Sequence, residues 1–356
     1  MLFACNISSL DTVSVSYSKY VLCFNKTASN ASFDLFSSSL SLLLKSNQSW
    51  ANVTNMMDLK IIQNRFIVKQ LLNKEQNCSF KYCYAQNALK DLNTIPKETN
   101  LMEKELLTGI RDQGACGSCW AFGAVAVIEN TILNSKLEGF WKQNNNVLDV
   151  SEIYFMSNAR GINNFCFGGE FTSAVNHYVQ AAKTVETEEN YAYHKLFWYQ
   201  IIFMMQIEIP PKLEELNWIM PFKIHNSSFG KTPIIGLHTN MSEKFTVETI
   251  KTVKSYLARG IAVAAVAAAG YYQEFALYDG KGYIDLACPG ENYIDHQVVF
   301  VGYKQINDVD VWIMRNSWGT QWGDQGYFYV KIGADSLCTE RYAYTVIPKT
   351  ASFTEM

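Results

Sequence analysis

Residues 113–122 read Gln-Gly-Ala-Cys-Gly-Ser-Cys-Trp-Ala-Phe, and a run rich in Ala, Val and Ile continues to Leu133. The apolar run predicts a buried helix that follows the Gly117-Ser118 pair. Cys119 then opens this helix, where unpaired N–H groups and the helix dipole stabilise negative charge. Because the thiolate is the reactive form of cysteine, a thiol in this position favours nucleophilic chemistry.

The Cys116 and Cys119 pair is a C-x-x-C pattern, which two other kinds of site also use. A zinc site would need a second pair with similar spacing, and the other close pair, Cys78 and Cys83, lies in the N-terminal segment. A thioredoxin-type redox centre would need a parallel-sheet pattern around the helix, which the sequence lacks. The sequence therefore favours a nucleophilic thiol over zinc or redox chemistry.

Small residues before the helix leave room for a substrate backbone beside Cys119. The backbone N–H of Cys119 and the side-chain amide of Gln113, six residues upstream, are two donors that can converge on one oxygen. Two convergent donors of this kind form an oxyanion hole, which stabilises a tetrahedral intermediate.

A thiolate also needs a base, and the chain has five histidines. His296 differs from the others because Gln-Val-Val-Phe-Val-Gly-Tyr follows it, a pattern typical of a buried strand. This places its imidazole on a rigid element. Asp295 is a candidate for orienting the ring, although neighbouring strand residues point to opposite faces of a sheet.

These segments together resemble the papain/cathepsin family of cysteine proteases. The string around Cys119 is similar to the family signature C-G-[SA]-C-[WY]. The histidine strand ends in the family's Val-Gly-Tyr, and Asn316-Ser-Trp318-Gly resembles the Asn-Ser-Trp-Gly motif. The resemblance implies that Cys119 is the nucleophile, His296 the base and Asn316 its orienting group. It also implies that Trp318 shields the His–Asn hydrogen bond from water and that Gln113 belongs to the oxyanion hole.

The expected fold class is α+β, with two lobes. Helical patterns cover 117–133 and most of 151–182, whereas strand and turn patterns dominate after about residue 230. The resemblance implies a papain-like peptidase domain over 95–356, with a helical lobe at about 95–215, a β-barrel-like lobe at about 216–348 and the active site in the cleft between them. The segment from Tyr193 to Pro221 has no interpretation.

Further details are implied by the resemblance alone. Cys116 would pair with Cys166, and Cys288 with Cys338. Gly168 and Gly169 would pair with an extended substrate backbone. An apolar pocket for the second residue before the scissile bond would have Glu170 at its rim and would be formed by Phe171, Ala265, Ile294 and Ala343. We see no paired-histidine insertion of the kind found in exopeptidases, so an endopeptidase is expected, with no metal or organic cofactor.

Residues 1–94 are rich in Ser, Asn and Leu and, by the resemblance, form an inhibitory propeptide. An unrelated extension is the alternative. Eight Asn-x-Ser/Thr sequons, six of them before residue 95, and nine cysteines favour the secretory pathway, extracellular or lysosomal/vacuolar, although no clear signal peptide is visible. We assign no pairing to four N-terminal cysteines: Cys5, Cys23, Cys78 and Cys83.

Composition limits the other functions. The net charge of −3 and the lack of a basic block argue against nucleic-acid binding. The apolar run from Gly260 to Gly270 is too short to span a membrane and is expected to be a core strand.

The expected protein is a monomer whose partners are protein or peptide substrates and its own propeptide. The alternative function is a catalytically silent homologue that binds peptides or partner proteins, which the complete catalytic set disfavours.

Overall fold

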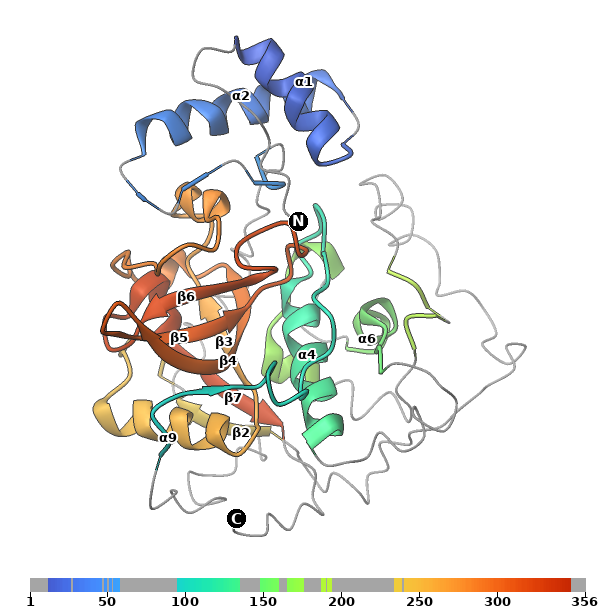
Figure 1. Ribbon diagram of the computed structural model, residues 1–356. Helices are drawn as coiled ribbons and strands as arrows, with labels where there is room; N and C mark the ends of the chain where they lie inside the picture. The colour runs from blue at the N-terminus through green and yellow to red at the C-terminus, as the bar shows by residue number, and fades with distance from the viewer. Residues whose placement is uncertain are drawn as a thin grey trace, which may run out of the picture.

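The computed structural model describes residues 12–26, 28–46, 48–49, 51–52, 54–57, 95–134, 148–159, 165–175, 187–189, 191–193, 234–238 and 240–346. Figure 1 shows a β-sheet body beside a long central helix, with two N-terminal helices above them. Within the described residues, no helix is long and apolar enough to cross a membrane.

An antiparallel sheet forms the body of the molecule and confirms the β-rich second half. Its main path has the order β2-β7-β3-β4-β5-β6, and β1 pairs with β4 at its side. The strands are β1 (Thr99–Asn100), β2 (Ile234–His238), β3 (Val263–Ala267), β4 (His296–Ile306), β5 (Val309–Arg315), β6 (Tyr327–Lys331) and β7 (Ala343–Val346). The short run of alanines predicted as a core strand is β3, and all five of its residues are buried.

The central helix α4 (Cys119–Asn134) begins at Cys119, as the sequence predicts, and its first 14 residues are buried. It packs against β4. The approach is close at Gly123, where an added Cβ would lie 2.6 Å from the Gln297 side chain. Helix α6 (Glu152–Asn158) lies beside α4 (Figure 1) and is capped by Ser151, whose hydroxyl accepts the N–H of Tyr154 over 3.0 Å.

The remaining helices surround this core. Helix α9 (Val247–Ala258) packs against β4 and β2. The N-terminal pair consists of α1 (Val13–Cys23) and α2 (Asn30–Lys45). A short helix covers residues 171–175, and four 3₁₀ turns are described: η1 (Phe165–Phe167), η3 (Gln273–Leu277), η4 (Glu291–Tyr293) and η5 (Ser336–Arg341).

The first residues of the predicted peptidase domain form β1, which pairs with β4 of the sheet. Thr99 pairs with Tyr303, and Asn100 with Gly302. A Cβ at Gly302 would lie 2.3 Å from the Thr99 carbonyl oxygen, so this crossing requires glycine. The first residues of the segment predicted as the helical lobe therefore belong to the β-sheet.

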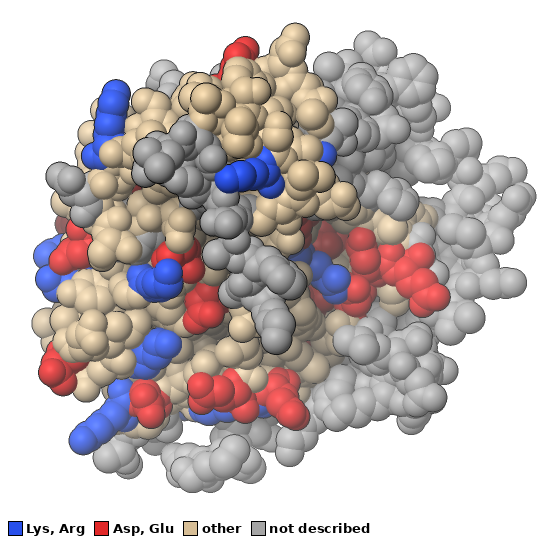
Figure 2. Space-filling model, turned by 45° about the horizontal axis from the view of Figure 1, so that its top comes forward, with Lys and Arg blue, Asp and Glu red and all other residues tan. Residues whose placement is uncertain are grey.

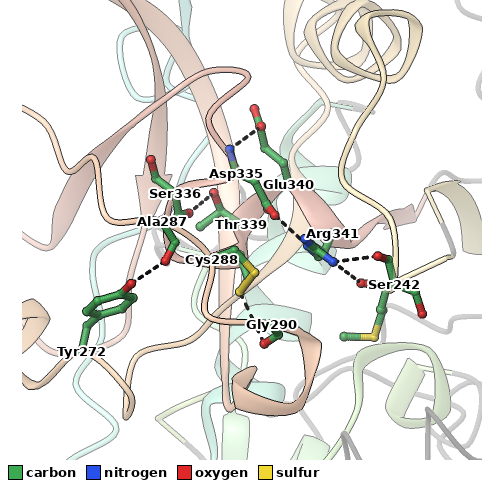
Figure 3. The surroundings of a disulfide bond; sticks show 12 residues. Ser242, Tyr272, Ala287, Cys288, Gly290, Asp335, Ser336, Thr339, Glu340 and Arg341 are labelled. Carbon is green, nitrogen blue, oxygen red and sulfur yellow. Dashed lines mark hydrogen bonds and ion pairs between the residues drawn. A yellow bond between two sulfur atoms is a disulfide. The ribbon is translucent and has the colours of Figure 1, made fainter.

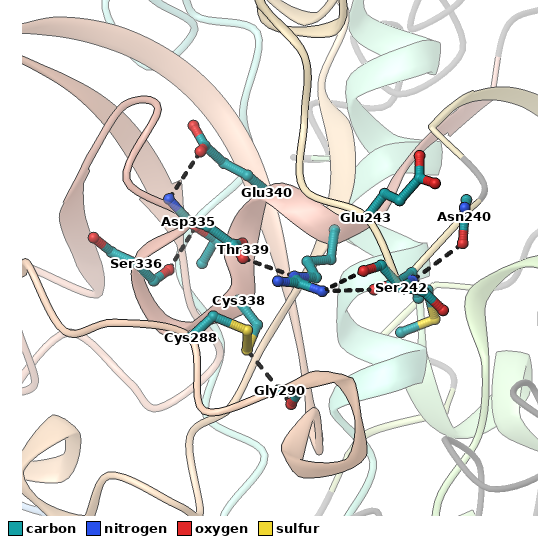
Figure 4. Close-up of polar contacts among 12 residues, drawn as sticks. Asn240, Ser242, Glu243, Cys288, Gly290, Asp335, Ser336, Cys338, Thr339 and Glu340 are labelled. Atoms are coloured by element: carbon teal, nitrogen blue, oxygen red, sulfur yellow. Dashed lines mark hydrogen bonds and ion pairs between the residues drawn. A yellow bond between two sulfur atoms is a disulfide. The ribbon is translucent and has the colours of Figure 1, made fainter.

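A disulfide between Cys288 and Cys338 ties η5 to the loop before η4, with 4.5 Å between the two Cα atoms. Figures 3 and 4 show its polar surroundings. The backbone N–H of Asp335 donates to the Glu340 carboxylate over 3.0 Å, and Arg341 forms an ion pair of 2.7 Å with Asp335. Asp335 and Cys338 both have left-handed backbone angles, so these contacts hold a conformation that non-glycine residues rarely adopt.

Charged side chains are mixed over the face shown in Figure 2. Lys and Arg side chains lie apart from one another, interspersed with Asp and Glu, and acidic side chains gather along the lower edge. The described residues therefore present both signs of charge on this face rather than one basic area.

Candidate active site

Cys119 lies at the first position of α4 and is 2% exposed. Cys116 forms a disulfide with Cys166, with 4.7 Å between the Cα atoms, and Cys119 belongs to neither described bridge. Gly117 donates its N–H to the Cys166 carbonyl over 3.1 Å, which holds the turn before the helix. Because Cys116 is bound to Cys166, the C-x-x-C pair is neither a dithiol redox couple nor half of a zinc site.

His296 and Asn316 meet although 20 residues separate them. The Nε2 atom of His296 lies 2.8 Å from Oδ1 of Asn316. The same oxygen accepts the backbone N–H of Ser317 over 2.8 Å, so the carboxamide has its oxygen on this side. An oxygen acceptor requires that Nε2 carry the hydrogen, which leaves Nδ1 as the ring atom that can take up a proton.

Trp318 covers this pair. Its ring lies 4.9 Å from the imidazole of His296, measured between centroids, and the side chain is 2% exposed. Phe275 and Trp322 in turn pack on Trp318, with centroid distances of 5.2 and 5.0 Å. The hydrogen bond between His296 and Asn316 therefore lies against an aromatic wall that belongs to the core of the sheet body.

Burial controls the charge of the imidazole in this structure. It lowers the pKa of His296 from 6.5 to about 4, although the hydrogen bond that the ring donates to Asn316 acts in the opposite direction. His296 is therefore neutral near pH 7 in the full-length chain as described.

Gln113 joins the loop before Cys119 to the segment that carries Asn316. Its backbone N–H donates to the Ser317 carbonyl over 2.8 Å, and its Oε1 accepts the Ser317 hydroxyl over 2.6 Å. Its Nε2 donates to the Cys116 carbonyl over 2.8 Å. An amide nitrogen carries two hydrogens, and this bond uses one of them. Ser317 was not singled out from the sequence, although it lies inside the Asn-Ser-Trp-Gly block.

The glycines expected to bind substrate lie against the start of α4. A Cβ on Gly169 would come within 2.1 Å of the Trp120 ring, so a larger residue does not fit there. The indole Nε1 of Trp120 donates to the Phe165 carbonyl over 3.0 Å. Gly168 has a φ of 121°, a conformation that favours glycine.

The structure corrects the expectation that Glu170 places a charge at a pocket rim. Glu170 is 5% exposed, and its carboxylate accepts the N–H groups of Thr172 and Ser173 over 2.8 and 2.7 Å. The hydroxyl of Tyr342 also donates to it over 2.6 Å. Glu170 therefore caps the short helix at 171–175 and fastens it to the residue before Ala343.

The four apolar residues expected to form the specificity pocket come from four parts of the fold. Ala265 lies on β3 and Ala343 begins β7, which pairs with β3, while Ile294 lies two residues before β4. The bond between Glu170 and Tyr342 brings Phe171 to the same region. All four are at most 3% exposed in the full-length chain.

A segment of the N-terminal region lies directly on the aromatic wall. Asn55 donates its side-chain N–H to the Trp318 carbonyl over 3.1 Å, and its own carbonyl accepts the Tyr20 hydroxyl over 3.0 Å. Ala51 pairs with Tyr278 in an antiparallel bridge. Leu277 completes this contact, because it packs into a small core formed with α1 and α2.

The chain thus holds a buried thiol at a helix start and a His–Asn pair beneath a tryptophan, which are the kinds of group that a thiol hydrolase uses. A sequence model described as papain family cysteine protease matches residues 95–347, and the chain belongs to that family. The family, the α+β papain fold and the cysteine-protease class predicted from the sequence are thus confirmed.

Curated relatives agree with this family. The chain is 28% identical over 310 residues to "Cysteine proteinase COT44" of Brassica napus, covering 83% of this chain and 80% of the relative. It is 27% identical over 246 residues to "Cathepsin L" of Sarcophaga peregrina, covering 69% of this chain and 61% of the relative.

Solved structures agree with the fold. A crystal structure of the Amb a 11 cysteine protease, a ragweed pollen allergen, in its proform superposes with a TM-score of 0.66 at 21% identity and covers 94% of each chain. Procathepsin L2 of Tenebrio molitor gives a TM-score of 0.66 at 18% identity, covering 94% of this chain and all of that one.

Proposed function

We propose that the chain is a cysteine endopeptidase in which Cys119, His296, Asn316 and Gln113 carry out acyl transfer. The main observation behind this proposal is the buried hydrogen bond of 2.8 Å between His296 and Asn316. In the same chain, Cys119 begins helix α4. Cys119 attacks the peptide carbonyl, and His296 delivers a proton to the leaving amine. Water activated by His296 then hydrolyses the thioester.

Each further residue has a physical task. The N–H of Cys119 and the Nε2 of Gln113 donate to the oxyanion of the tetrahedral intermediate. Asn316 fixes the ring so that Nδ1 handles the transferred proton, and Trp318 excludes water from the hydrogen bond that does this. Because Asp295 uses its carboxylate to accept the Gly270 N–H over 3.0 Å, it serves the neighbouring loop, which supports Asn316 over Asp295 as the orienting group.

The substrate is an extended peptide with an apolar second residue before the scissile bond. Gly168 and Gly169 pair with its backbone. Its apolar side chain enters the region of Phe171, Ala265, Ile294 and Ala343. The buried and hydrogen-bonded carboxylate of Glu170 supports this preference, because it is not available to attract a basic side chain.

Residues 1–94 act as a propeptide that inhibits the enzyme in a monomeric precursor. The contacts of Asn55 and Ala51 with the sheet body support this role, because they fix the N-terminal region next to Trp318. Burial of His296 supports it too, since a neutral imidazole does not form the ion pair that activates a thiol.

Two disulfides in the described chain support folding in the secretory pathway, extracellular or lysosomal, where sequons can be glycosylated. Among the sequon asparagines that the structure describes, Asn25, Asn30 and Asn52 are exposed, and the side-chain amide of Asn52 donates to Asp279 over 3.3 Å. Cys5, Cys78 and Cys83, whose pairing was left open, lie outside the described residues.

A covalent thiol probe tests the proposed function. The full-length chain is processed by acid or by an added protease and treated with an epoxysuccinyl peptide, and the labelled residue is identified by mass spectrometry. We expect label on Cys119 and hydrolysis of a fluorogenic peptide with Leu or Phe at the second position, in preference to Arg. Cys119→Ala should retain the fold and lose both signals. An unlabelled Cys119 in the processed chain would instead indicate a catalytically silent peptide-binding homologue.

A further inference from the structure

Tyr193 lies beside the loop that precedes Cys119, although 74 residues or more separate them in the chain. Its hydroxyl donates to the Gln113 carbonyl over 2.9 Å. The same oxygen lies 2.9 Å from the hydroxyl of Ser118. A hydroxyl has one hydrogen, so with that hydrogen on the Gln113 carbonyl, Ser118 must donate to Tyr193.

The ring is held firmly in this position. It packs edge-on against Phe122 in the first turn of α4, with 4.8 Å between centroids. The backbone N–H of Tyr193 donates to the carboxylate of Glu188. Two residues earlier, the Tyr191 carbonyl accepts the hydroxyl of Ser151, the capping residue of α6, over 2.6 Å. The position of Tyr193 is therefore set by the helical part of the fold.

The two residues bound by Tyr193 are those that carry the proposed oxyanion donors. Gln113 supplies its side-chain amide. The peptide unit between Ser118 and Cys119 supplies the Cys119 N–H, because that N–H and the Ser118 carbonyl share one plane. Burial raises the pKa of the Tyr193 hydroxyl, so it stays protonated and keeps its donor role at all working pH values.

We propose that Tyr193 is a positioning residue that sets the separation of the two oxyanion donors, Gln113 and Cys119. This inference rests on the proposed catalytic roles of those two residues. Tyr193 does not touch the reacting atoms in this assignment. Its hydroxyl holds Gln113 through the Gln113 carbonyl, and it holds Cys119 through the neighbouring Ser118. In this way the hydroxyl affects the transition state.

The test compares reactions that use the oxyanion hole with one that does not. Tyr193→Phe is made in the full-length chain, which is processed and active-site titrated. Loss of a whole oxyanion donor typically costs about 10²–10³-fold in kcat, so displacement of a donor should lower kcat about tenfold. We expect KM to change less than about twofold and a peptide aldehyde, whose hemithioacetal oxygen occupies the hole, to bind about tenfold more weakly.

Alkylation by iodoacetamide forms no oxyanion, so its rate at Cys119 should be unchanged in Tyr193→Phe. Ser118→Ala should reproduce part of the effect and be non-additive with Tyr193→Phe. Tyr303→Phe is the matched control, because its hydroxyl also donates to a carbonyl, that of Pro96, over 3.0 Å. It should leave all four quantities unchanged.

Two results would overturn the assignment of Tyr193. One is an unchanged kcat and aldehyde affinity in Tyr193→Phe. The other is a parallel fall in alkylation and hydrolysis, which would show a general structural role. Failure of the proposed function looks different, because the wild-type chain itself would then be neither alkylated at Cys119 nor active.

Discussion

The imidazole of His296 donates to the carboxamide oxygen of Asn316, and the Ser317 N–H binds the same oxygen. Both bonds measure 2.8 Å, and both Asn316 and His296 are buried. The backbone thus fixes the side chain of Asn316, which in turn fixes the ring of His296. This arrangement explains how a residue 20 positions along the chain can decide which imidazole nitrogen carries the hydrogen.

Asn316→Ala should therefore impair catalysis more than folding. Without Oδ1 the ring loses the partner that holds its orientation and tautomer, and a misplaced catalytic group costs on the order of 10²-fold in kcat. KM should change little. Steady-state kinetics after active-site titration measure this. Gln305→Ala removes a comparable amide, bound to Asp310 over 2.9 Å at an exposed site, and should leave kcat unaltered. Equal kinetics for Asn316→Ala and wild type would contradict the orienting role.

The low pKa of His296 predicts a dependence of precursor stability on pH. The ring has a pKa of about 4 in the folded chain and about 6.5 when unfolded. Between these values the unfolded chain binds a proton that the folded chain does not, so stability falls as the pH falls from 6.5 to 4. The loss should approach about 3 kcal/mol at the acid end.

Urea denaturation of a Cys119→Ala precursor at several pH values measures this effect, with ¹³C-histidine NMR to follow the ring directly. Burial raises the pKa of Glu129 and Glu152, which acts in the opposite sense, so the comparison must be with the same precursor carrying His296→Asn. The difference in free energy of unfolding between the two variants should be independent of pH above pH 7 and should change only below it. An imidazole that titrates between pH 6 and 7 in the precursor would refute the prediction.

The sequence was sufficient for elements whose pattern is local. The start of α4 at Cys119 and the strand at His296 follow from apolar runs bounded by small or polar residues. The pairing of His296 with Asn316 required the family resemblance, because nothing local connects two residues on different elements. Contacts that depend on long-range packing were not predicted. Tyr193 begins a segment that has no interpretation from the sequence, yet its hydroxyl reaches Gln113 and Ser118.

The sequence did not predict the burial of the charged side chain of Glu170. The family resemblance implied that Glu170 lies at a pocket rim. It is buried, because the helix at 171–175 needs a cap and Tyr342 supplies a further donor.

The crossing of β1 to β4 was also missed, since a strand of two residues, Thr99–Asn100, has no periodicity to recognise.

Contacts of the N-terminal region predict the effect of a mutation on maturation. Asn55→Ala removes the bond to the Trp318 carbonyl, worth about 1 kcal/mol net, so the population with this region undocked should rise about fivefold. Processing at a given pH should accelerate by a similar factor, as followed by gel electrophoresis. Ser38→Ala, which removes a hydroxyl bond to the Asp34 carbonyl within exposed α2, is the control and should process normally. Identical rates for Asn55→Ala and wild type would argue against inhibition by docking.

The buried carboxylate of Glu340 predicts a large effect on stability far from Cys119. Glu340 is fully buried, and its Oε1 accepts the indole N–H of Trp312 over 2.8 Å and the N–H of Gly333 over 2.7 Å. Its other oxygen accepts the N–H of Asp335 (Figure 4). Glu340→Leu would leave three buried donors without an acceptor, and we expect a loss of about 3 kcal/mol in the free energy of unfolding.

Two further variants separate hydrogen bonding from packing at this position. Trp312→Phe combined with Glu340→Leu removes one donor together with its acceptor, so the double variant should lose less than the sum of the single ones. Glu340→Gln keeps the shape and one acceptor oxygen and should cost less than Glu340→Leu. Urea denaturation in the Cys119→Ala background gives the five free energies that are needed: those of the parent, Glu340→Leu, Trp312→Phe, the double variant and Glu340→Gln. A Glu340→Leu chain as stable as the parent would show that these donors find water or other partners, and that the carboxylate does not hold η5 against β5.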